Sequence, residues 1–167
     1  MAESRLKSLV ASDVADLREF LGSVDLTVSG LDAPSVRLWI ERDDEGAVVA
    51  STGYEISDDG RHALIRSVAV NPRLRSAGRG SELATFAISR ARDEGAGTAW
   101  LFSRRSGPFW QNLGFEPADR AELASALAGT QQVALFRATG QLEREVAWSR
   151  DLADYSRPGQ TLPAQGS

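Results

Sequence analysis

The segment from Val68 to Ser81 constrains the fold more than any other part of the chain. An apolar run up to Val70 predicts a β-strand, which ends at Pro72 because the residue before a proline avoids helical geometry. A loop rich in arginine and glycine follows and opens a long helix. A helix start presents free N–H groups and positive partial charge, and glycines let a phosphate approach the backbone. The segment therefore predicts a site for a polyphosphate group, with an ordinary exposed loop as the alternative.

Other nucleotide-binding loops do not match the sequence. The Gly-x-x-x-x-Gly-Lys-Ser/Thr pattern of P-loop proteins is missing, and Leu83 occupies the position of the third glycine in a dinucleotide-binding fingerprint. The Gly-x-Ser-x-Gly elbow of serine hydrolases is also missing, and the single histidine, His62, lies beside a predicted turn. We therefore expect neither of these nucleotide-binding classes nor a serine hydrolase.

The hydrophobic pattern predicts a mixed sheet with helices on its faces. An antiparallel meander comes first, and a strand–helix–strand unit follows it. The expected strands are 5–10, 36–41, 47–56, 63–70, 98–102 and 145–152, and the expected helices are 12–22, 78–94, 108–114 and one capped by Asp119. Residues 23–35 are expected to form a loop with room for one short helix. The predicted core is Leu38, Ile40, Val49, Val68, Val70, Phe86, Leu101 and Phe115.

Composition narrows the class of protein. The 167 residues fit one domain, expected at 1–152, and the tail 153–167, rich in Pro, Gly, Gln and Ser, is expected to be disordered. The absence of cysteine and the single histidine exclude thiolate chemistry and sites with two imidazoles, and no metal is expected. A net charge of −4 argues against nucleic-acid binding. Without a long apolar run or a signal peptide, no membrane contact and a cytoplasmic location are expected, and a homodimer is left open.

Two motifs resemble those of the GCN5-related N-acetyltransferase (GNAT) superfamily. The loop Arg-Ser-Ala-Gly-Arg-Gly at 75–80 is similar to its Arg/Gln-x-x-Gly-x-Gly/Ala motif, and Phe-Trp-Gln-Asn-Leu-Gly-Phe-Glu at 109–116 is similar to its second signature. The resemblance covers about residues 5–152. It implies an α/β (α+β) fold with a mixed, mostly antiparallel central sheet of six to seven strands flanked by helices. It also implies acetyl-CoA as co-substrate and a small primary amine as acceptor.

A narrower resemblance concerns the acceptor. Gly-Tyr-Glu at 53–55, the strand 63–70, the Asp-Arg pair at 119–120 and the closing run 146–152 look like the bacterial arsinothricin-resistance N-acetyltransferase group. Enzymes of that group acetylate the α-amine of glutamate-like compounds. The resemblance therefore implies an amino acid or a glutamate-like antimetabolite as acceptor, and detoxification as the role.

The resemblance also implies which residues hold the coenzyme. The backbone of Val68, Ala69 and Val70 would lie along its pantetheine arm. Ser103 and Trp110 occupy positions where many members have Asn and Tyr, and they are expected beside the coenzyme. The pyrophosphate would be cradled by the backbone N–H groups of Arg75, Ser76, Ala77, Gly78, Arg79, Gly80 and Ser81.

Trp110 departs from the family pattern in a way that bears on the chemistry. A tyrosine hydroxyl can protonate a leaving thiolate, whereas the indole N–H is too weak an acid. The thiolate would then leave unassisted or take a proton from water, or the domain would bind acyl-CoA without transferring the acyl group. The alternatives to a small-molecule acetyltransferase are thus an acyl-CoA-binding or sensing module and an acetyltransferase for a protein N-terminus or lysine.

Glu55 is the candidate general base, acting through water on an amine whose pKa is about 8. Its alternative role is a cross-strand ion pair with Arg66, and Glu41 is a weaker candidate base of the same type. Arg104 and Arg105 follow a predicted strand and are expected to be exposed, although they could meet either CoA or an anionic substrate.

Arg66 is a charged residue in an otherwise apolar strand. Period-two alternation places Leu64, Val68 and Val70 on its face. A charge there needs a partner, so Arg66 either grips a substrate carboxylate, pairs with Glu55, or extends its head to water.

Overall fold

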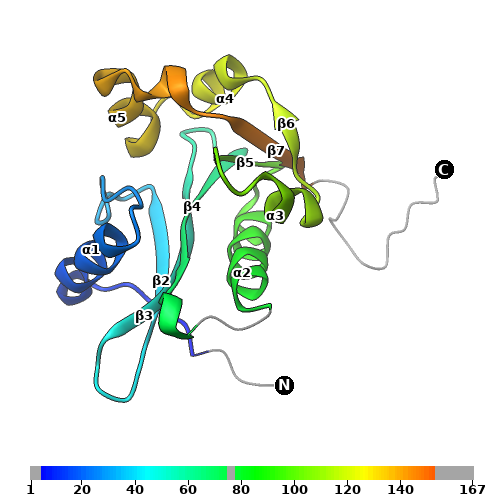
Figure 1. Ribbon diagram of the computed structural model, residues 1–167. Helices are drawn as coiled ribbons and strands as arrows, with labels where there is room; N and C mark the ends of the chain where they lie inside the picture. The colour runs from blue at the N-terminus through cyan, green and yellow to red at the C-terminus, as the bar shows by residue number, and fades with distance from the viewer. Residues whose placement is uncertain (1–4, 75–77, 153–167) are drawn as a thin grey trace.

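Seven strands form one mixed sheet at the centre of the molecule (Figure 1). The computed structural model describes residues 5–74 and 78–152, so the predictions for Arg75, Ser76, Ala77 and the tail 153–167 lie outside the described residues. The strand order is β1-β2-β3-β4-β5-β7-β6, in which β4 and β5 are parallel and the other neighbours antiparallel. The predicted mixed, mostly antiparallel sheet with flanking helices is confirmed.

Most elements lie where the hydrophobic pattern predicts them, with shifted ends. The strands are β1 (Lys7–Ser8), β2 (Val36–Arg42), β3 (Val48–Ile56), β4 (His62–Val70), β5 (Thr98–Phe102), β6 (Glu116–Ala118) and β7 (Ala147–Asp151). The helices are α1 (Val14–Ser23), α2 (Arg79–Glu94), α3 (Gly107–Asn112), α4 (Arg120–Ala126) and α5 (Gln131–Thr139), with 3-10 turns at Ala11–Asp13, Pro72–Leu74 and Gln141–Arg144.

Strand β6 and helix α5 were not predicted. Helix α5 has recognisable ends, because the Thr130 hydroxyl accepts a hydrogen bond from the Val133 N–H and Gly140 ends the helix with a φ of +79°. Helix α1 starts after Asp13 rather than after Ser12, and it continues through Gly22 to Ser23. A glycine with negative φ can remain inside a helix, which is why Gly22 does not end it.

The helices cover the two faces of the sheet unequally (Figure 1). Helix α1 packs its leucines against the Leu38 and Ile40 side chains of β2. Helices α4 and α5 pack around Leu64 and Trp100. Helix α2 packs a row of small residues against Tyr54, Ile65 and Leu101, and α3 joins this cluster through Trp110. Of the predicted core, Val68, Val70 and Phe86 are only half-buried, while the other five residues are buried.

A β-bulge at Ser67 changes which residues of β4 share a face. Ser67 has a φ of +61°, in the left-handed region, and the register between β3 and β4 shifts beside it. The face that carries Arg66 continues with Ala69, whereas Val68 packs in the cluster beneath α2. The predicted placement of Val68 and Val70 on the face of Arg66 is therefore wrong, because one extra residue reverses the alternation.

Strands β4 and β5 pair only along their first halves. The parallel ladder joins residues 62–64 of β4 to 98–100 of β5, while β5 pairs with β7 along its whole length. Beyond the ladder, residues 65–70 of β4 turn an edge toward β5 without pairing to it. The fold thus leaves an opening in the middle of its own sheet.

Candidate functional site

A cleft occupies the opening between the second halves of β4 and β5. Its first part is a cavity of about 490 Å³, bounded by residues 65–70 of β4 and 101–103 at the end of β5. Gly80 of α2 and the aromatic rings of Phe109 and Trp110 from α3 complete its wall. Leu26, Thr27 and Gln132 also line this cavity, so it reaches from the α2 and α3 side of the sheet through the opening to the other side.

The cleft continues to the opposite face of the sheet. A second cavity of about 450 Å³ shares residues 68–70, 102–103 and Thr27 with the first. Its remaining wall comes from the loop after α1, from α5, and from residues 104–105, Gln141 and Glu145. Two ligands that enter from opposite faces can therefore meet between β4 and β5.

The start of α2 adjoins the first cavity. Gly78 caps the helix with a φ of +87°, a conformation that residues with a Cβ rarely adopt, and a Cβ built on it would meet nothing within 4 Å. The first N–H groups of this 16-residue helix have no partner in the preceding turn of helix, and its dipole favours an anion there. The space and the donors suit a phosphate group, as the sequence predicts.

Arg79 has partners within the protein. Its guanidinium pairs with Glu41 of β2 and, at 3.0 Å, with Glu82 one turn along α2. The pair with Glu41 ties the start of α2 to the sheet. Glu41, the weaker candidate base, lies outside the walls of both cavities.

The wall opposite β4 is aromatic. Trp110 is buried and packs edge-on against both Phe109 and Phe115. Ser103 lines both cavities, and its hydroxyl accepts a hydrogen bond from the Ser106 N–H at 3.0 Å. The structure thus places Trp110 and Ser103 beside the same cleft as Val68, Ala69 and Val70.

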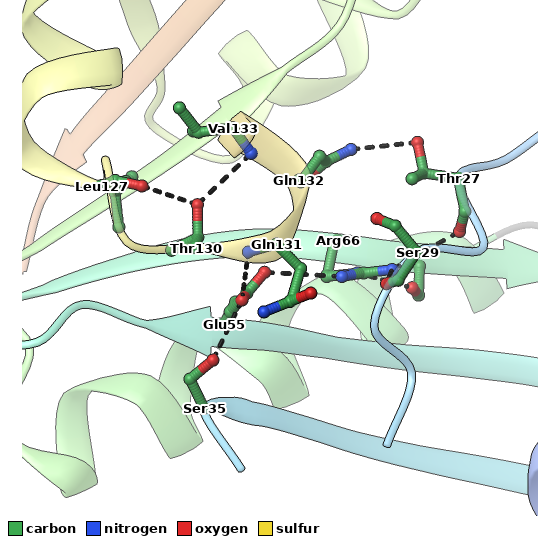
Figure 2. Close-up of polar contacts among 11 residues, drawn as sticks. Thr27, Ser29, Ser35, Glu55, Arg66, Leu127, Thr130, Gln131, Gln132 and Val133 are labelled. Carbon is green, nitrogen blue, oxygen red and sulfur yellow. Dashed lines mark hydrogen bonds and ion pairs between the residues drawn. The ribbon is translucent and has the colours of Figure 1, made fainter. Parts of the chain in front are cut away.

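Glu55 and Arg66 form a buried ion pair (Figure 2). Arg66 Nη1 lies 3.5 Å from Glu55 Oε1, and the two side chains are 1% and 0% exposed. The cross-strand ion pair that the sequence offered as one alternative is therefore confirmed. Burial lowers the pKa of Arg66, and the charge of Glu55 opposes this shift.

The remaining atoms of the pair connect three segments of the chain (Figure 2). Glu55 Oε2 accepts hydrogen bonds from Ser35 Oγ at 3.0 Å and from the Gln131 N–H at 2.5 Å. Arg66 Nη2 donates to the Ser29 carbonyl at 2.8 Å. The sheet is thereby tied both to the loop between α1 and β2 and to the start of α5.

The two members of the pair differ in their relation to the cleft. Arg66 lines the first cavity, whereas Glu55 lines neither cavity. Close to them, Gln132 Nε2 donates to Thr27 Oγ1 at 3.2 Å and both residues line the cleft (Figure 2). Arg66 is therefore part of the wall of the cleft, and Glu55 holds it from behind.

Ser103, Arg104 and Arg105 of the second cavity were candidates from the sequence, whereas Thr27, Gln132 and Glu145 were not. Glu145 lies just before β7, and Thr27 and Gln132 lie in a loop and in the unpredicted α5. No local motif marks these positions, since they meet only when the chain folds. His62, in contrast, lies at the far end of β4, where its Nδ1 accepts a hydrogen bond from Trp100 Nε1.

Within the described residues, no group of three or more His, Cys, Asp or Glu side chains is arranged to hold a metal ion. No helix of residues 5–74 or 78–152 is both long and apolar enough to cross a membrane.

The mixed sheet that opens between two parallel strands, with a glycine-capped helix at the opening, gives this chain a fold that a class of solved acetyltransferases shares. Within this class, the chain belongs to the acetyltransferase (GNAT) family, whose family model matches residues 9–115. The predicted family is therefore confirmed.

The curated relatives carry one name. The amino-acid acetyltransferase of Pseudomonas fluorescens (strain Pf0-1) is 35% identical over 85 residues, and that of Pseudomonas syringae pv. syringae is 33% identical over 84 residues. The matches cover 50% of this chain and 19% of each relative. The chain thus spans about one fifth of the length of these relatives.

Solved structures share the fold at low sequence identity. The N-acetylglutamate synthase from Neisseria gonorrhoeae, complexed with coenzyme A and N-acetyl-glutamate, superposes with a TM-score of 0.67 at 19% identity, over 90% of this chain and 36% of that one. Rv2747 from Mycobacterium tuberculosis, in complex with CoA and NLQ, gives 0.68 at 17% identity, over 88% and 98% of the two chains. The similarity to these structures thus covers more of the chain than the family match, which ends at residue 115.

Proposed function

We propose that this protein is an acetyl-CoA-dependent N-acetyltransferase that acts on the primary amine of a small molecule. We propose an amino acid as this acceptor. The observation that carries the proposal is the cleft that runs from the start of α2 through the sheet. Membership of the GNAT family and the names of the curated relatives support it. The narrower arsinothricin-resistance resemblance, and with it the detoxification role, stays a prediction.

The first cavity suits the coenzyme. Its glycine-capped helix start, free of side chains at Gly78 and Gly80, would take the pyrophosphate, together with the N–H groups of Arg79 and Ser81. The unpaired edge of β4 at residues 68–70 would hold the pantetheine arm by backbone hydrogen bonds. Ser103 and Trp110 would close the cavity around the thioester. Acetyl-CoA supplies the activated acetyl group, and the chain supplies position and polarisation.

The reaction needs a neutral amine next to the thioester carbonyl. The amine nitrogen forms a bond to the carbonyl carbon, the carbon–sulfur bond breaks, and the sulfur leaves with the electron pair. A thiol has a pKa of about 8.5, so its thiolate is a fair leaving group without a protein acid. This suits a cleft in which Trp110 replaces the tyrosine hydroxyl.

For Glu55 and Arg66 we propose a positioning role. Glu55 is fully buried and bonded to Ser35, Gln131 and Arg66, and the guanidinium of Arg66 donates to backbone carbonyls. Neither side chain needs a substrate to satisfy its hydrogen bonds. The alternative assignments, Glu55 as base and Arg66 as the group that grips a substrate carboxylate, predict loss of turnover or a higher KM without loss of stability.

A second candidate function is an acyl-CoA-binding module without transfer. The specific observation in its favour is Trp110, which lines the cleft where an acidic hydroxyl is usual in the family. The acetyltransferase for a protein N-terminus or lysine stays a further alternative from the sequence.

The test combines binding with turnover. Calorimetry with acetyl-CoA measures binding of the coenzyme, which we expect in the first cavity. A thiol-release assay with a panel of amino acids, amines and lysine peptides measures acetyl transfer. We expect binding together with CoA release in the presence of amino acids. Binding without release for every amine would favour the binding module, release with peptides alone would favour the protein acetyltransferase, and no binding would refute the assignment to acetyl-CoA.

A further inference from the structure

The part of the cleft on the α1 and α5 side contains a carboxylate that the roles above do not use. Glu145 lines the cavity of about 450 Å³ although its side chain is only 6% exposed. Its Oε2 accepts a hydrogen bond from Gln141 Nε2 at 2.8 Å and lies 3.5 Å from Arg104 Nε. Burying a carboxylate is costly without such partners, so the fold holds this group in place at the cleft.

Backbone contacts fix Glu145 beside the junction of the two cavities. The Ser103 N–H donates to the carbonyl of the next residue, Val146, at 2.9 Å. Arg120 Nη1 donates to the Glu145 carbonyl at 3.0 Å. Ser103 lines both cavities, so the segment that carries Glu145 is anchored where the two parts of the cleft meet.

Two arginines line the same cavity as Glu145. Arg104 and Arg105 both line the second cavity and both are exposed, Arg104 with 47% of its side chain. The loop after α1 also contributes Asp25 to this cavity, and α5 contributes the neutral Gln132. A cavity that holds a buried carboxylate and two accessible arginine side chains is complementary to a zwitterion, whose ammonium would bind the carboxylate and whose carboxylate would bind the guanidinium groups.

We propose that this part of the cleft is the acceptor subsite for an α-amino acid, in which Glu145 binds the ammonium and takes its proton while Arg104 and Arg105 bind the α-carboxylate. The proposal rests on the proposed acetyl transfer. One ammonium proton passes to Glu145, the nitrogen lone pair then bonds to the acetyl carbonyl carbon, and the carbon–sulfur bond breaks. The nitrogen's remaining excess proton goes to the departing sulfur, and Glu145 returns its proton to water.

The test compares each amino acid with its α-carboxamide, which has the same shape but no carboxylate charge. The thiol-release assay measures kcat and KM for both acceptors, and calorimetry follows acetyl-CoA separately. The unmodified protein should prefer the acid over the amide by roughly tenfold or more, the worth of a charge-assisted hydrogen bond. This preference is unexpected from amine basicity alone, because the amide's amine is the more easily deprotonated one.

Two variants separate the two roles. Glu145→Gln should lower kcat by roughly 100-fold for acids and amides alike, the usual contribution of a general base, with acetyl-CoA binding unchanged. Arg105→Ala should raise KM for the acids by roughly tenfold and leave KM for the amides unchanged. Arg105 is preferred to Arg104 because Arg104 also holds Glu145. Arg144→Ala, an exposed arginine of the neighbouring 3-10 turn, should match the unmodified protein.

The outcomes distinguish this proposal from the function on which it rests. Equal turnover of acids and amides, or a Glu145→Gln variant with unchanged kcat, would overturn the subsite while the acetyltransferase assignment stands. Binding of acetyl-CoA without acceptance of any amino acid would also overturn it. Absence of acetyl-CoA binding would instead refute the proposed function.

Discussion

Charge buried inside an apolar sheet is the main energetic feature at the scale of single residues. The Glu55–Arg66 pair has lost almost all contact with water, and its hydrogen bonds reach Ser35, Ser29 and Gln131. Removing both members of such a pair is often tolerated, whereas removing one leaves an uncompensated charge in the interior. The stability of the fold with either charge buried therefore depends on the presence of the other charge.

A double-mutant cycle tests this dependence. Arg66→Met and Glu55→Gln should each lower the free energy of unfolding by about 3–5 kcal/mol, and the double variant should lose clearly less than the sum. Urea unfolding measures all three. Glu82→Gln breaks an exposed pair of α2 and, as the control, should cost less than about 1 kcal/mol. Additive losses would contradict the coupling, and a Glu55→Gln variant of normal stability with little turnover would restore Glu55 as candidate base.

At the scale of elements, the start of α2 and the start of α5 matter most for the cleft. Gly80 lines the first cavity, and a Cβ on it would make only ordinary contact, 3.5 Å from Phe109. Thr130 caps α5, and the N–H of its first residue, Gln131, donates a hydrogen bond to the Glu55 carboxylate. The start of α2 thus faces the first cavity, and the start of α5 holds Glu55, the partner of Arg66 in the cavity wall.

Gly80→Glu should abolish acetyl-CoA binding without unfolding the protein. A carboxylate in the first turn of a helix is favourable to the helix by about 0.3–1 kcal/mol, but it would repel a pyrophosphate and fill the cavity. Calorimetry with acetyl-CoA, together with a melting curve, measures both effects. Gly80→Ala is the matched control and should keep most of the binding, because it adds a methyl group without charge. Unchanged affinity in Gly80→Glu would place the coenzyme elsewhere.

Thr130→Ala should destabilise the protein by about 1 kcal/mol, the usual cost of losing an N-cap. The Thr130 hydroxyl accepts from the Val133 N–H and donates to the Leu127 carbonyl, and both contacts are buried. Thr139→Ala, near the exposed end of the same helix, should cost markedly less. Thermal unfolding of the two variants measures the difference, and equal losses would contradict the capping role.

At the scale of the whole molecule, paired carboxyl groups link stability to pH. The Val10 N–H and then Arg42 lower the pKa of Asp13, and Ser57 and the Arg61 N–H lower that of Asp59. Burial raises the pKa of Glu94, but hydrogen bonds from Tyr54 and Arg37 outweigh it, so that this pKa is also lowered. Each of these carboxyl groups binds a proton more weakly in the folded protein than in the unfolded chain, so each stabilises the fold above its unfolded pKa.

The melting temperature should therefore hold above about pH 5 and fall progressively as the pH drops through 4 and below, where these carboxyl groups protonate. Asp13→Asn should lower the melting temperature near neutral pH and flatten the fall in acid, because the variant has one group fewer to protonate. Thermal melts followed by circular dichroism between about pH 2.5 and pH 7 measure how steeply the melting temperature of each protein falls with pH. The fall should centre at ~pH 4, where carboxyl groups titrate. Asp44→Asn, in the exposed β2–β3 turn, controls for the loss of one charge. Parallel curves for Asp13→Asn and the unmodified protein would contradict the link.

The sequence predicted the elements whose signals are local. Such signals come from residues within a few positions of one another. They correctly placed the strands with period-two alternation, the long amphipathic helix α2 and the capping residue Asp119. Helix α5 was missed because its buried residues, Val133 and Phe136, are few and depend on distant partners. Val133 packs with the residues of α4, and Phe136 packs against Phe102 of β5. The cytoplasmic location and a homodimer stay predictions.

The sequence by itself determined the family and the helix start that suits a phosphate, because both follow from a contiguous motif whose backbone geometry is local. Only the tertiary structure decided that the bulge at Ser67 reverses the alternation of side chains along β4. It also decided that Glu55 forms an ion pair with Arg66. It alone brought Glu145 and Arg105 to one cavity of the cleft. Burial and ion pairing depend on residues that are distant in the chain, so no local pattern specifies them.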